Sequence, residues 1–297
     1  MKSITCALCG TDFLCGAAEK SCWCAELPSL PKSAQDMPAG CYCKACLQKK
    51  IAEARLKEQA PHWQENPTLL NVEKVMQLLS AYHRYQVEGM DCLPQTGAGL
   101  IVTHHSLATY DGFMLGMKIW QQRQRLVRAL GDNLLFTLPL MHQWMRDLGV
   151  VPGAAGAASE LLDQGELVAV APGGMRECLR PSDQKYQVRW AKRKGFVKLA
   201  IEKQVPVYLT ACPKADDIFT VYENPITAAI YKNFKFPVPL FRGIGLTTIP
   251  KPIALTQYIE GPFQPPAFSS QSFDSDVDSF HALLTEKMQG LLDKGKS

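Results

Sequence analysis

The chain has 297 residues, of which 46% are hydrophobic and 20% are charged, and its formal net charge is +4. This length and apolar content predict one large domain with a small appendage, and the modest charge alone does not separate a membrane surface from coenzyme phosphates or nucleic acid as a partner. No run of about 18 apolar residues is present, and the first ten residues lack the apolar core of a signal peptide, so we expect no transmembrane span and no secretion.

The N-terminal segment is dominated by cysteine. Eight of the eleven cysteines lie within the first 46 residues, at Cys6, Cys9, Cys15, Cys22, Cys24, Cys41, Cys43 and Cys46. A chain that is not secreted keeps its thiols reduced, so closely spaced cysteines favour metal thiolates over disulfides. The sequence therefore predicts a cysteine-rich module over residues 1–50 that is stabilised by zinc.

The spacing of these cysteines suggests how they share metal. Two pairs separated by two residues, Cys6/Cys9 and Cys43/Cys46, are spaced to hold one tetrahedral zinc ion from tight turns. Eight thiols can complete two such sites, and the grouping stays open. A single zinc ion with leftover thiols and a disulfide-bonded module are the alternatives. So small a module has little core, and metal binding would supply much of its folding free energy.

Helical patterns follow the cysteines. Residues 45–60 are rich in Lys, Glu, Ala and Gln and predict a charged helical connector. Asn71 to Gln86 carries apolar residues at helical spacing, which predicts an amphipathic helix. We expect residues 51–95 to link the module to a catalytic domain over residues 96–297.

A first candidate site follows a short apolar strand, Leu100 to Val102. At the end of a strand, His105 can take a proton from a hydroxyl group, and the carboxylate of Asp111 can fix its tautomer and stabilise its cation. The alternative is that His104 and His105 are polar residues that only cap the strand.

A second candidate site follows the apolar strand Leu167 to Val170. Gly173 and Gly174 allow backbone amides to approach an oxyanion or a phosphate closely. Arg176 can pair with a phosphate, and Glu177 can accept a substrate hydroxyl or brace the loop. The alternative is an ordinary turn. Because open α/β sheets carry their chemistry at the carboxyl ends of strands, both sites fit a central, mostly parallel or mixed sheet flanked by helices.

Three later segments complete the pattern. Lys185 to Lys203 holds seven lysines and arginines interleaved with apolar residues, and predicts an amphipathic helix that faces coenzyme phosphates or anionic headgroups, or else a solvated charged face. Residues 234–241, FKFPVPLF, are apolar enough to enter a membrane or to pack against the core. Ser279 to Leu292 predicts a closing helix.

The motifs HSLATYD and APGGMRE together resemble the glycerolipid acyltransferase superfamily. That family usually has four residues between its histidine and its aspartate; the five found here are similar to its diacylglycerol-acyltransferase-like branch. The similarity covers roughly residues 70 to 270, through the segments 136–154, 180–207 and 259–266. The first 48 residues resemble small bacterial domains named for a Cys-Trp-Cys signature, here at residues 22–24, and no function is carried over from them.

The resemblance implies roles for the residues of both sites. His105 would be the general base and Asp111 its orienting carboxylate, with His104, one residue off the pattern, as a structural neighbour or the alternative base. Four residues would contact the polar head of the acceptor or the developing oxyanion: Gly173, Gly174, Arg176 and Glu177. Arg146 is the nearest candidate for a contact with acceptor phosphate. The proline that commonly follows the family's fourth motif is absent after Val207.

The implied reaction moves a fatty acyl group from acyl-CoA or acyl carrier protein to a hydroxyl of a lysophospholipid, glycerolipid or related lipid. It needs no catalytic cofactor, and Cys178 as a covalent nucleophile is the less favoured route. We expect a cytoplasmic protein, peripherally attached to the inner face of the cell membrane. A thioesterase that uses the same base is one alternative, although no GxSxG serine motif is present. A zinc-ribbon nucleic-acid binder is another, but residues 1–50 hold no arginine, so we expect no nucleic-acid partner.

Overall fold

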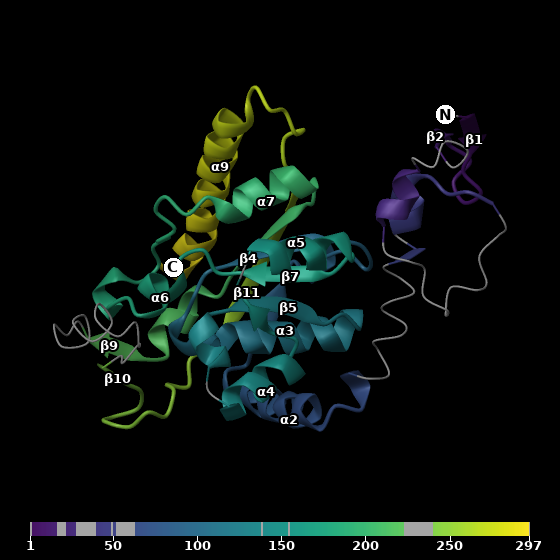
Figure 1. Ribbon diagram of the computed structural model, residues 1–297. Coiled ribbons are helices and arrows are strands. Elements are labelled where there is room, and N and C mark those ends of the chain that lie inside the picture. Colours follow the sequence, from purple (N-terminus) through teal and green to yellow (C-terminus); the bar gives the residue numbers. More distant parts are fainter. Residues whose placement is uncertain are drawn as a thin grey trace.

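The computed structural model describes residues 2–16, 22–27, 40–48, 50–51, 63–137, 139–153, 155–222 and 240–296. Most of these residues form one layered α/β domain, and the described residues up to Ile51 form a small separate module (Figure 1). In the module, strands β1 (Lys2–Thr5) and β2 (Asp12–Cys15) pair in an antiparallel hairpin.

A mixed sheet of seven strands forms the centre of the described part of the α/β domain. Its order across the sheet is β3 (Gln86–Glu88), β11 (Thr256–Phe263), β8 (Val207–Ala211), β4 (Gly99–Thr103), β7 (Leu167–Val170), β5 (Val127–Gly131) and β6 (Val151–Pro152). Strands β8, β4, β7, β5 and β6 are parallel to one another, whereas β11 is antiparallel to β8 and parallel to β3. The prediction of a mostly parallel or mixed sheet is confirmed.

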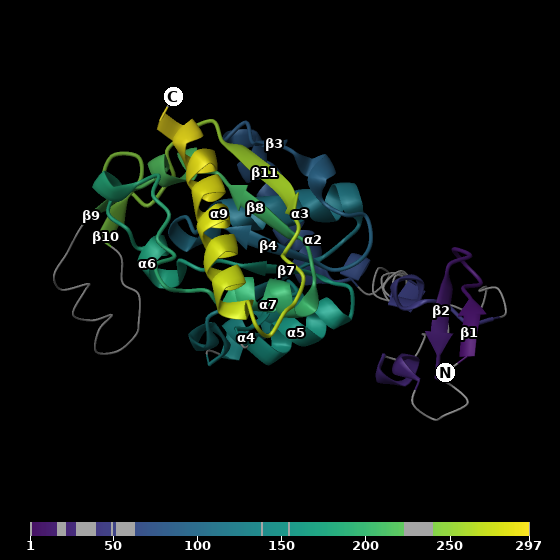
Figure 2. The same ribbon diagram turned by 90° about the horizontal axis from the view of Figure 1, so that it is seen from above.

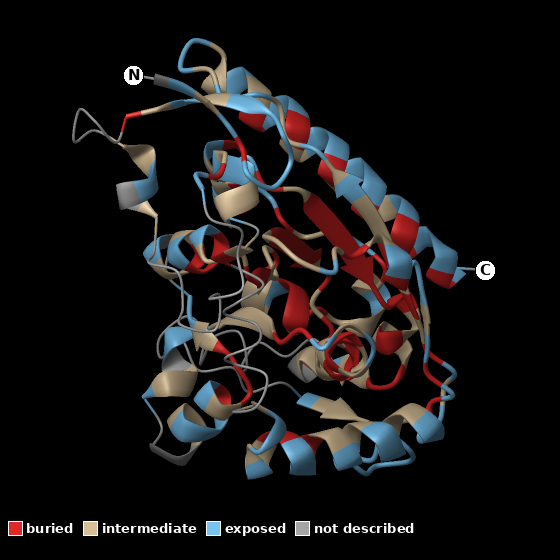
Figure 3. Ribbon diagram, turned by 90° about the vertical axis from the view of Figure 1, so that its right-hand side faces the viewer, coloured by how far each residue is buried: buried red, intermediate tan, exposed pale blue. Residues whose placement is uncertain are grey.

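The central strands are apolar because both faces of the sheet are covered. Along β4, Leu100 and Val102 belong to one core cluster, and Ile101 between them belongs to another on the opposite face. Figure 3 shows that buried residues gather on these strands and on the inward sides of the helices.

Helices cover both faces of the sheet (Figures 1 and 2). Three pack on the face of Leu100, namely α5 (Ala155–Asp163), α7 (Gly195–Lys203) and α9 (Phe273–Asp293). The opposite face carries α3 (Tyr110–Arg123), with α2 (Pro67–Tyr82) and α4 (Pro139–Asp147) packed on its outer side. No described helix is long and apolar enough to cross a membrane.

Two predicted helices are confirmed, with shifted ends. The helix expected over 71–86 is α2, which begins earlier because the side chain of Asn66 accepts hydrogen bonds from Thr68 N at 2.9 Å and Leu69 N at 3.2 Å. The closing helix is α9, longer at its N-terminal end than expected. Of the predicted connector, residues 45–48 and 50–51 are helical and residues 52–60 lie outside the described part.

The helix predicted over Lys185 to Lys203 is wrong in its first half, because α7 begins only at Gly195. Tyr186 and Ala191 adopt left-handed backbone conformations, with φ of 59° and 52°, which a right-handed helix cannot accommodate. Trp190, between them, is fully buried and anchors this irregular segment to the core.

A second, two-stranded sheet belongs to the same domain. Strands β9 (Thr220–Tyr222) and β10 (Leu240–Arg242) are antiparallel to each other. Of the apolar segment 234–241, residues 234–239 lie outside the described part of the chain.

Candidate functional site

The candidate site lies where β4, β7 and β8 end side by side. Since β4 pairs in parallel with both β7 and β8, the residues that follow these three strands meet at one edge of the sheet. His104 and His105 follow β4. Pro172 to Gly174 follow β7 and lead into the short helix α6 (Gly174–Cys178), and the 3-10 turn Pro213–Asp217 follows β8.

His104 lies buried between two carboxylates. Its Nδ1 is 3.2 Å from Glu177 Oε1, and its Nε2 is 3.6 Å from Asp216 Oδ2. Burial and the nearby Arg180 lower the pKa of His104, but the two carboxylates outweigh them and raise it above its ordinary 6.5. His104 therefore joins the two loops that carry Glu177 and Asp216, which supports the role of a structural neighbour.

His105 is partly exposed and has a defined tautomer. Its Nδ1 lies 2.8 Å from the carbonyl oxygen of Ser106, which can only accept, so Nδ1 carries the proton. The other nitrogen, Nε2, lies 3.4 Å from Thr109 Oγ1 and keeps its lone pair. Burial lowers the pKa of His105 below 6.5, so its imidazole is neutral at pH 7. This is the state that a general base requires.

The structure does not join His105 to Asp111 by a hydrogen bond. Asp111 is buried at the first turn of α3 and accepts a hydrogen bond from Ser106 Oγ. Burial raises the pKa of Asp111. Ser106, which sequence reasoning missed, links the two, because its hydroxyl contacts Asp111 and its carbonyl oxygen accepts from His105.

Glu177 and Arg180 hold the backbone of His105 from both sides. Glu177 Oε2 accepts from His105 N at 2.9 Å, and Arg180 Nη1 donates to His105 O at 2.7 Å. The other Glu177 oxygen accepts from Arg189 N at 3.1 Å. Because Glu177 is completely buried, this geometry fits the bracing role rather than contact with a substrate hydroxyl.

Asp216 is the second residue that sequence reasoning missed. Arg180 donates to both of its oxygens, and Tyr186 N donates to Oδ2 at 3.0 Å. Burial alone would raise the pKa of Asp216, but His104 and Arg180 lower it to about 2. The position of Asp216 in the sequence could have indicated its place in the site, because a carboxylate soon after β8 must lie at the same edge of the sheet as His105.

The glycine loop is tightly folded. A side chain on Gly173 would place its Cβ 2.3 Å from Cδ of Glu177, and Gly174 has φ of +50°. The amide of Gly174 donates to Ala171 O at 3.0 Å, and Arg193 Nη1 donates to Gly173 O at 2.6 Å. The Gly174 amide is therefore already used within the turn.

The remaining predicted contacts differ in exposure. Arg176 is exposed on α6, and no hydrogen bond or ion pair joins it to a described residue, so it can meet an anion. Arg146 is exposed on α4, and no hydrogen bond or ion pair within the described part of the chain links it to His105. The thiol of Cys178 is buried.

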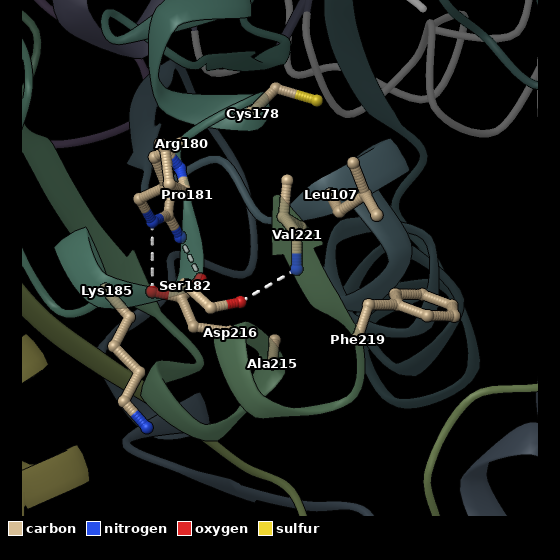
Figure 4. Close-up of a pocket in the computed structure, with 10 residues that line it drawn as sticks. All are labelled: Leu107, Cys178, Arg180, Pro181, Ser182, Lys185, Ala215, Asp216, Phe219 and Val221. Carbon is tan, nitrogen blue, oxygen red and sulfur yellow. Dashed lines mark hydrogen bonds and ion pairs between the residues drawn. The ribbon is translucent and has the colours of Figure 1, made fainter. Parts of the chain in front are cut away.

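A small open hollow lies beside Arg180, whose guanidinium donates to the His105 carbonyl oxygen (Figure 4). Arg180 and Asp216 form one side, and apolar Leu107 and Phe219 form another. The rest of the lining is Cys178, Pro181, Ser182, Lys185, Ala215 and Val221. The hollow therefore joins an apolar wall to the charged network that fixes His105.

Four of the eight N-terminal cysteines form a compact cluster. The sulfurs of Cys6, Cys9, Cys43 and Cys46 all lie within 4.8 Å of one another. The Cys9 and Cys43 sulfurs are 3.7 Å apart, close to the roughly 3.8 Å between two thiolates that bind one tetrahedral zinc ion at about 2.3 Å. The amide of Cys43 also donates to Cys6 Sγ at 3.3 Å. The cluster can hold a metal ion, and its donor set fits zinc.

The other four cysteines are also neighbours. Cys24 Sγ lies 2.9 Å from Cys22 Sγ, and the thiol of Cys15 contacts those of Cys22 and Cys41. The structure thus groups the eight cysteines as two sets of four, although only the first set is compact enough in the described residues to enclose an ion.

Both parts of the chain are similar to known protein families. Residues 84–212 match the acyltransferase family, and residues 6–48 match the cysteine-rich CWC family. A Bos taurus protein named "DGAT1/2-independent enzyme synthesizing storage lipids" is 27% identical over 209 residues, which cover 69% of this chain and 60% of that protein. Its Gallus gallus namesake is 30% identical over 162 residues, covering 54% of this chain and 48% of that protein. The chain thus spans about three fifths or less of these relatives.

Among solved structures, the 1-acyl-sn-glycerophosphate acyltransferase PlsC from Thermotoga maritima is similar, with a TM-score of 0.48 and 17% identity. The alignment covers 82% of this chain and 92% of that one.

Proposed function

The chain belongs to the glycerolipid acyltransferase superfamily and carries an N-terminal cysteine-rich module, and on this premise we propose that it transfers a fatty acyl group from a thioester to a lipid hydroxyl. The observation that carries the proposal is the state of His105: a neutral imidazole with Nδ1 committed to a carbonyl oxygen and Nε2 left as the basic nitrogen.

The proposed reaction has two steps. His105 Nε2 takes the proton of the acceptor hydroxyl while the oxygen attacks the thioester carbonyl, which gives a tetrahedral oxyanion. The oxyanion collapses, the carbon–sulfur bond breaks, and the leaving thiolate takes the proton from the His105 imidazolium. Asp111 acts through Ser106 to orient the ring, and backbone amides near Gly173 are the proposed donors to the oxyanion.

The surroundings of His105 support the proposed classes of substrate. We assign the apolar wall of the hollow to the acyl chain or a lipid tail, and Arg176 to a phosphate of the donor or of the acceptor head. The donor is acyl-CoA or acyl carrier protein, and the acceptor is a lysophospholipid, a glycerolipid or a related lipid. The enzyme would meet that acceptor at the inner face of the cell membrane as a peripheral protein.

We propose that the cysteine module binds structural zinc. Cys6, Cys9, Cys43 and Cys46 would hold one ion, and Cys15, Cys22, Cys24 and Cys41 would hold a second. The bound ion would supply much of the folding free energy of the module and no step of the reaction.

The proposed function is tested by following thiol release from a long-chain acyl-CoA, with and without lysophospholipid or diacylglycerol. We expect thiol release and an acylated lipid that both depend on the acceptor, and their loss in His105→Ala with the fold intact. Thiol release that ignores every acceptor would identify a thioesterase instead. Retained transfer in His105→Ala would overturn the assignment of the base.

A further inference from the structure

A turn beyond β10 exposes an unusual amount of apolar surface. Over residues 243–250 the chain folds back on itself, and three aliphatic side chains project from it: Ile244 is 45% exposed, Leu246 is 93% exposed and Ile249 is 55% exposed. Of the large hydrophobic residues that the structure describes, Leu246 is the most exposed. Such a patch favours an interaction surface over a solvated loop.

The turn is preformed by its own hydrogen bonds. Gly243 N donates to Thr247 O at 2.7 Å, Ile244 N donates to Ile249 O at 2.9 Å, and Thr247 N donates to Ile244 O at 3.0 Å. A Cβ on Gly243 would lie 1.7 Å from Ile249 O, so the close approach of the two legs requires glycine there. Because these polar groups are already paired, the turn can enter an apolar phase with less desolvation cost than an open loop.

The charge around the turn suits an anionic surface. Residues 240–259 contain Arg242 and Lys251 and no acidic residue. Arg242 donates to Gly245 O at 2.9 Å and to the Tyr222 hydroxyl at 2.5 Å, which holds the guanidinium at the base of the turn. A cation at the base of the turn would contact lipid headgroups, while the aliphatic side chains at its tip would reach the acyl chains.

The turn is also close to the candidate site. It continues from β10, which pairs with β9, and Val221 of β9 lines the hollow (Figures 1 and 4). The Phe241 ring packs edge-on against the ring of Phe219, which lines the hollow, with 5.1 Å between the ring centroids. At the C-terminal end of the turn, Pro250 O accepts a hydrogen bond from the Tyr82 hydroxyl, at the end of α2, at 2.8 Å.

We propose that residues 243–250 form a wedge that inserts Ile244, Leu246 and Ile249 into an anionic lipid bilayer and brings the hollow lined by Arg180 and Phe219 to the membrane. This inference rests on the proposed function for its purpose, since an acyltransferase without a membrane-bound acceptor would not need the wedge. The binding event itself depends only on the turn.

Cosedimentation with vesicles of phosphatidylcholine and phosphatidylglycerol tests the wedge directly. We expect Leu246→Asp to weaken vesicle binding by about tenfold, because the variant loses the free energy gained when the Leu246 side chain moves from water into the bilayer. The matched control is Leu283→Asp, which places the same change at an exposed leucine on α9 and should leave vesicle binding unchanged. Equal binding of wild type and Leu246→Asp would overturn the proposal.

Two further measurements keep the proposal distinct from its alternatives. With short-chain acyl-CoA and a monomeric short-chain acceptor, Leu246→Asp should match wild type, and it should fall behind only with acceptor presented in vesicles. If wild type transfers no acyl group at all, the proposed function fails while sedimentation still decides the wedge. If Leu246→Asp instead abolishes self-association without changing vesicle binding, the turn is a contact between two copies of the chain and the wedge is refuted.

Discussion

Asp216→Asn removes one charge from the buried network behind His105. Lowering the pKa of this carboxyl from 3.8 to about 2 corresponds to about 2 kcal/mol of stability at pH 7. The Arg180 guanidinium would also lose its buried partner, and breaking a buried ion pair typically destabilises a protein by about 3–5 kcal/mol. We therefore expect the free energy of unfolding to fall by about 2–5 kcal/mol.

Urea unfolding followed by circular dichroism measures this loss at pH 7. The matched control is Asp278→Asn, whose carboxylate pairs with Lys194 while 66% exposed, and such surface pairs contribute about 0–1 kcal/mol. The pH dependence gives a second test. A lowered carboxyl pKa contributes stability that is present above pH 3.8 and is lost as the pH falls through about 2, so the variant should lack this part of the acid transition. A loss no larger than that of Asp278→Asn would refute the view that the network supports the site.

Four other outcomes are expected. The raised pKa of His104 contributes stability that is fully present below pH 6.5 and is lost as the pH rises through the folded-state pKa. In urea unfolding at several pH values, the free energy of unfolding of His104→Gln should therefore lack this dependence on pH. The lowered pKa of His105 places the acid limb of kcat/KM below pH 6.5; a limb above 6.5 would exclude His105 as the base. Gly173→Ala should destabilise by about 1–3 kcal/mol because its Cβ meets Glu177, whereas Gly116→Ala in α3, with open space around it, should stabilise by about 0.5–1 kcal/mol. Elemental analysis should find about two zinc ions per chain, and Cys9→Ser should lose one and unfold the N-terminal module in NMR spectra while the α/β domain stays folded; a folded module without metal would contradict this.

The sheet and its edge could be predicted because they depend on local pattern. Leu100 to Val102 and Leu167 to Val170 are apolar runs that only a strand covered on both faces explains, and the residues after them had to meet at one edge. The helix through Lys185 failed because apolar periodicity does not report the backbone turns at Tyr186 and Ala191.

The partners of each site residue could not be predicted, because they come from distant parts of the chain. Asp216 lies beyond β8 and reaches His104 only once β8 has paired with β4. The link through Ser106 depends on side-chain directions at the first turn of α3, which spacing alone cannot supply. Sequence position therefore suggested His105 as the base and left open which residues hold it in place.

The convergence of three strand ends on His104 has a consequence for biosynthesis. When the ribosome has released the chain only as far as Arg180, the sheet lacks β8, and the Arg180 guanidinium has no Asp216 to balance its charge. The order of translation therefore makes the pairing of β8 with β4, followed by Asp216, the event that completes the buried ion network, whereas β11 joins the sheet only later.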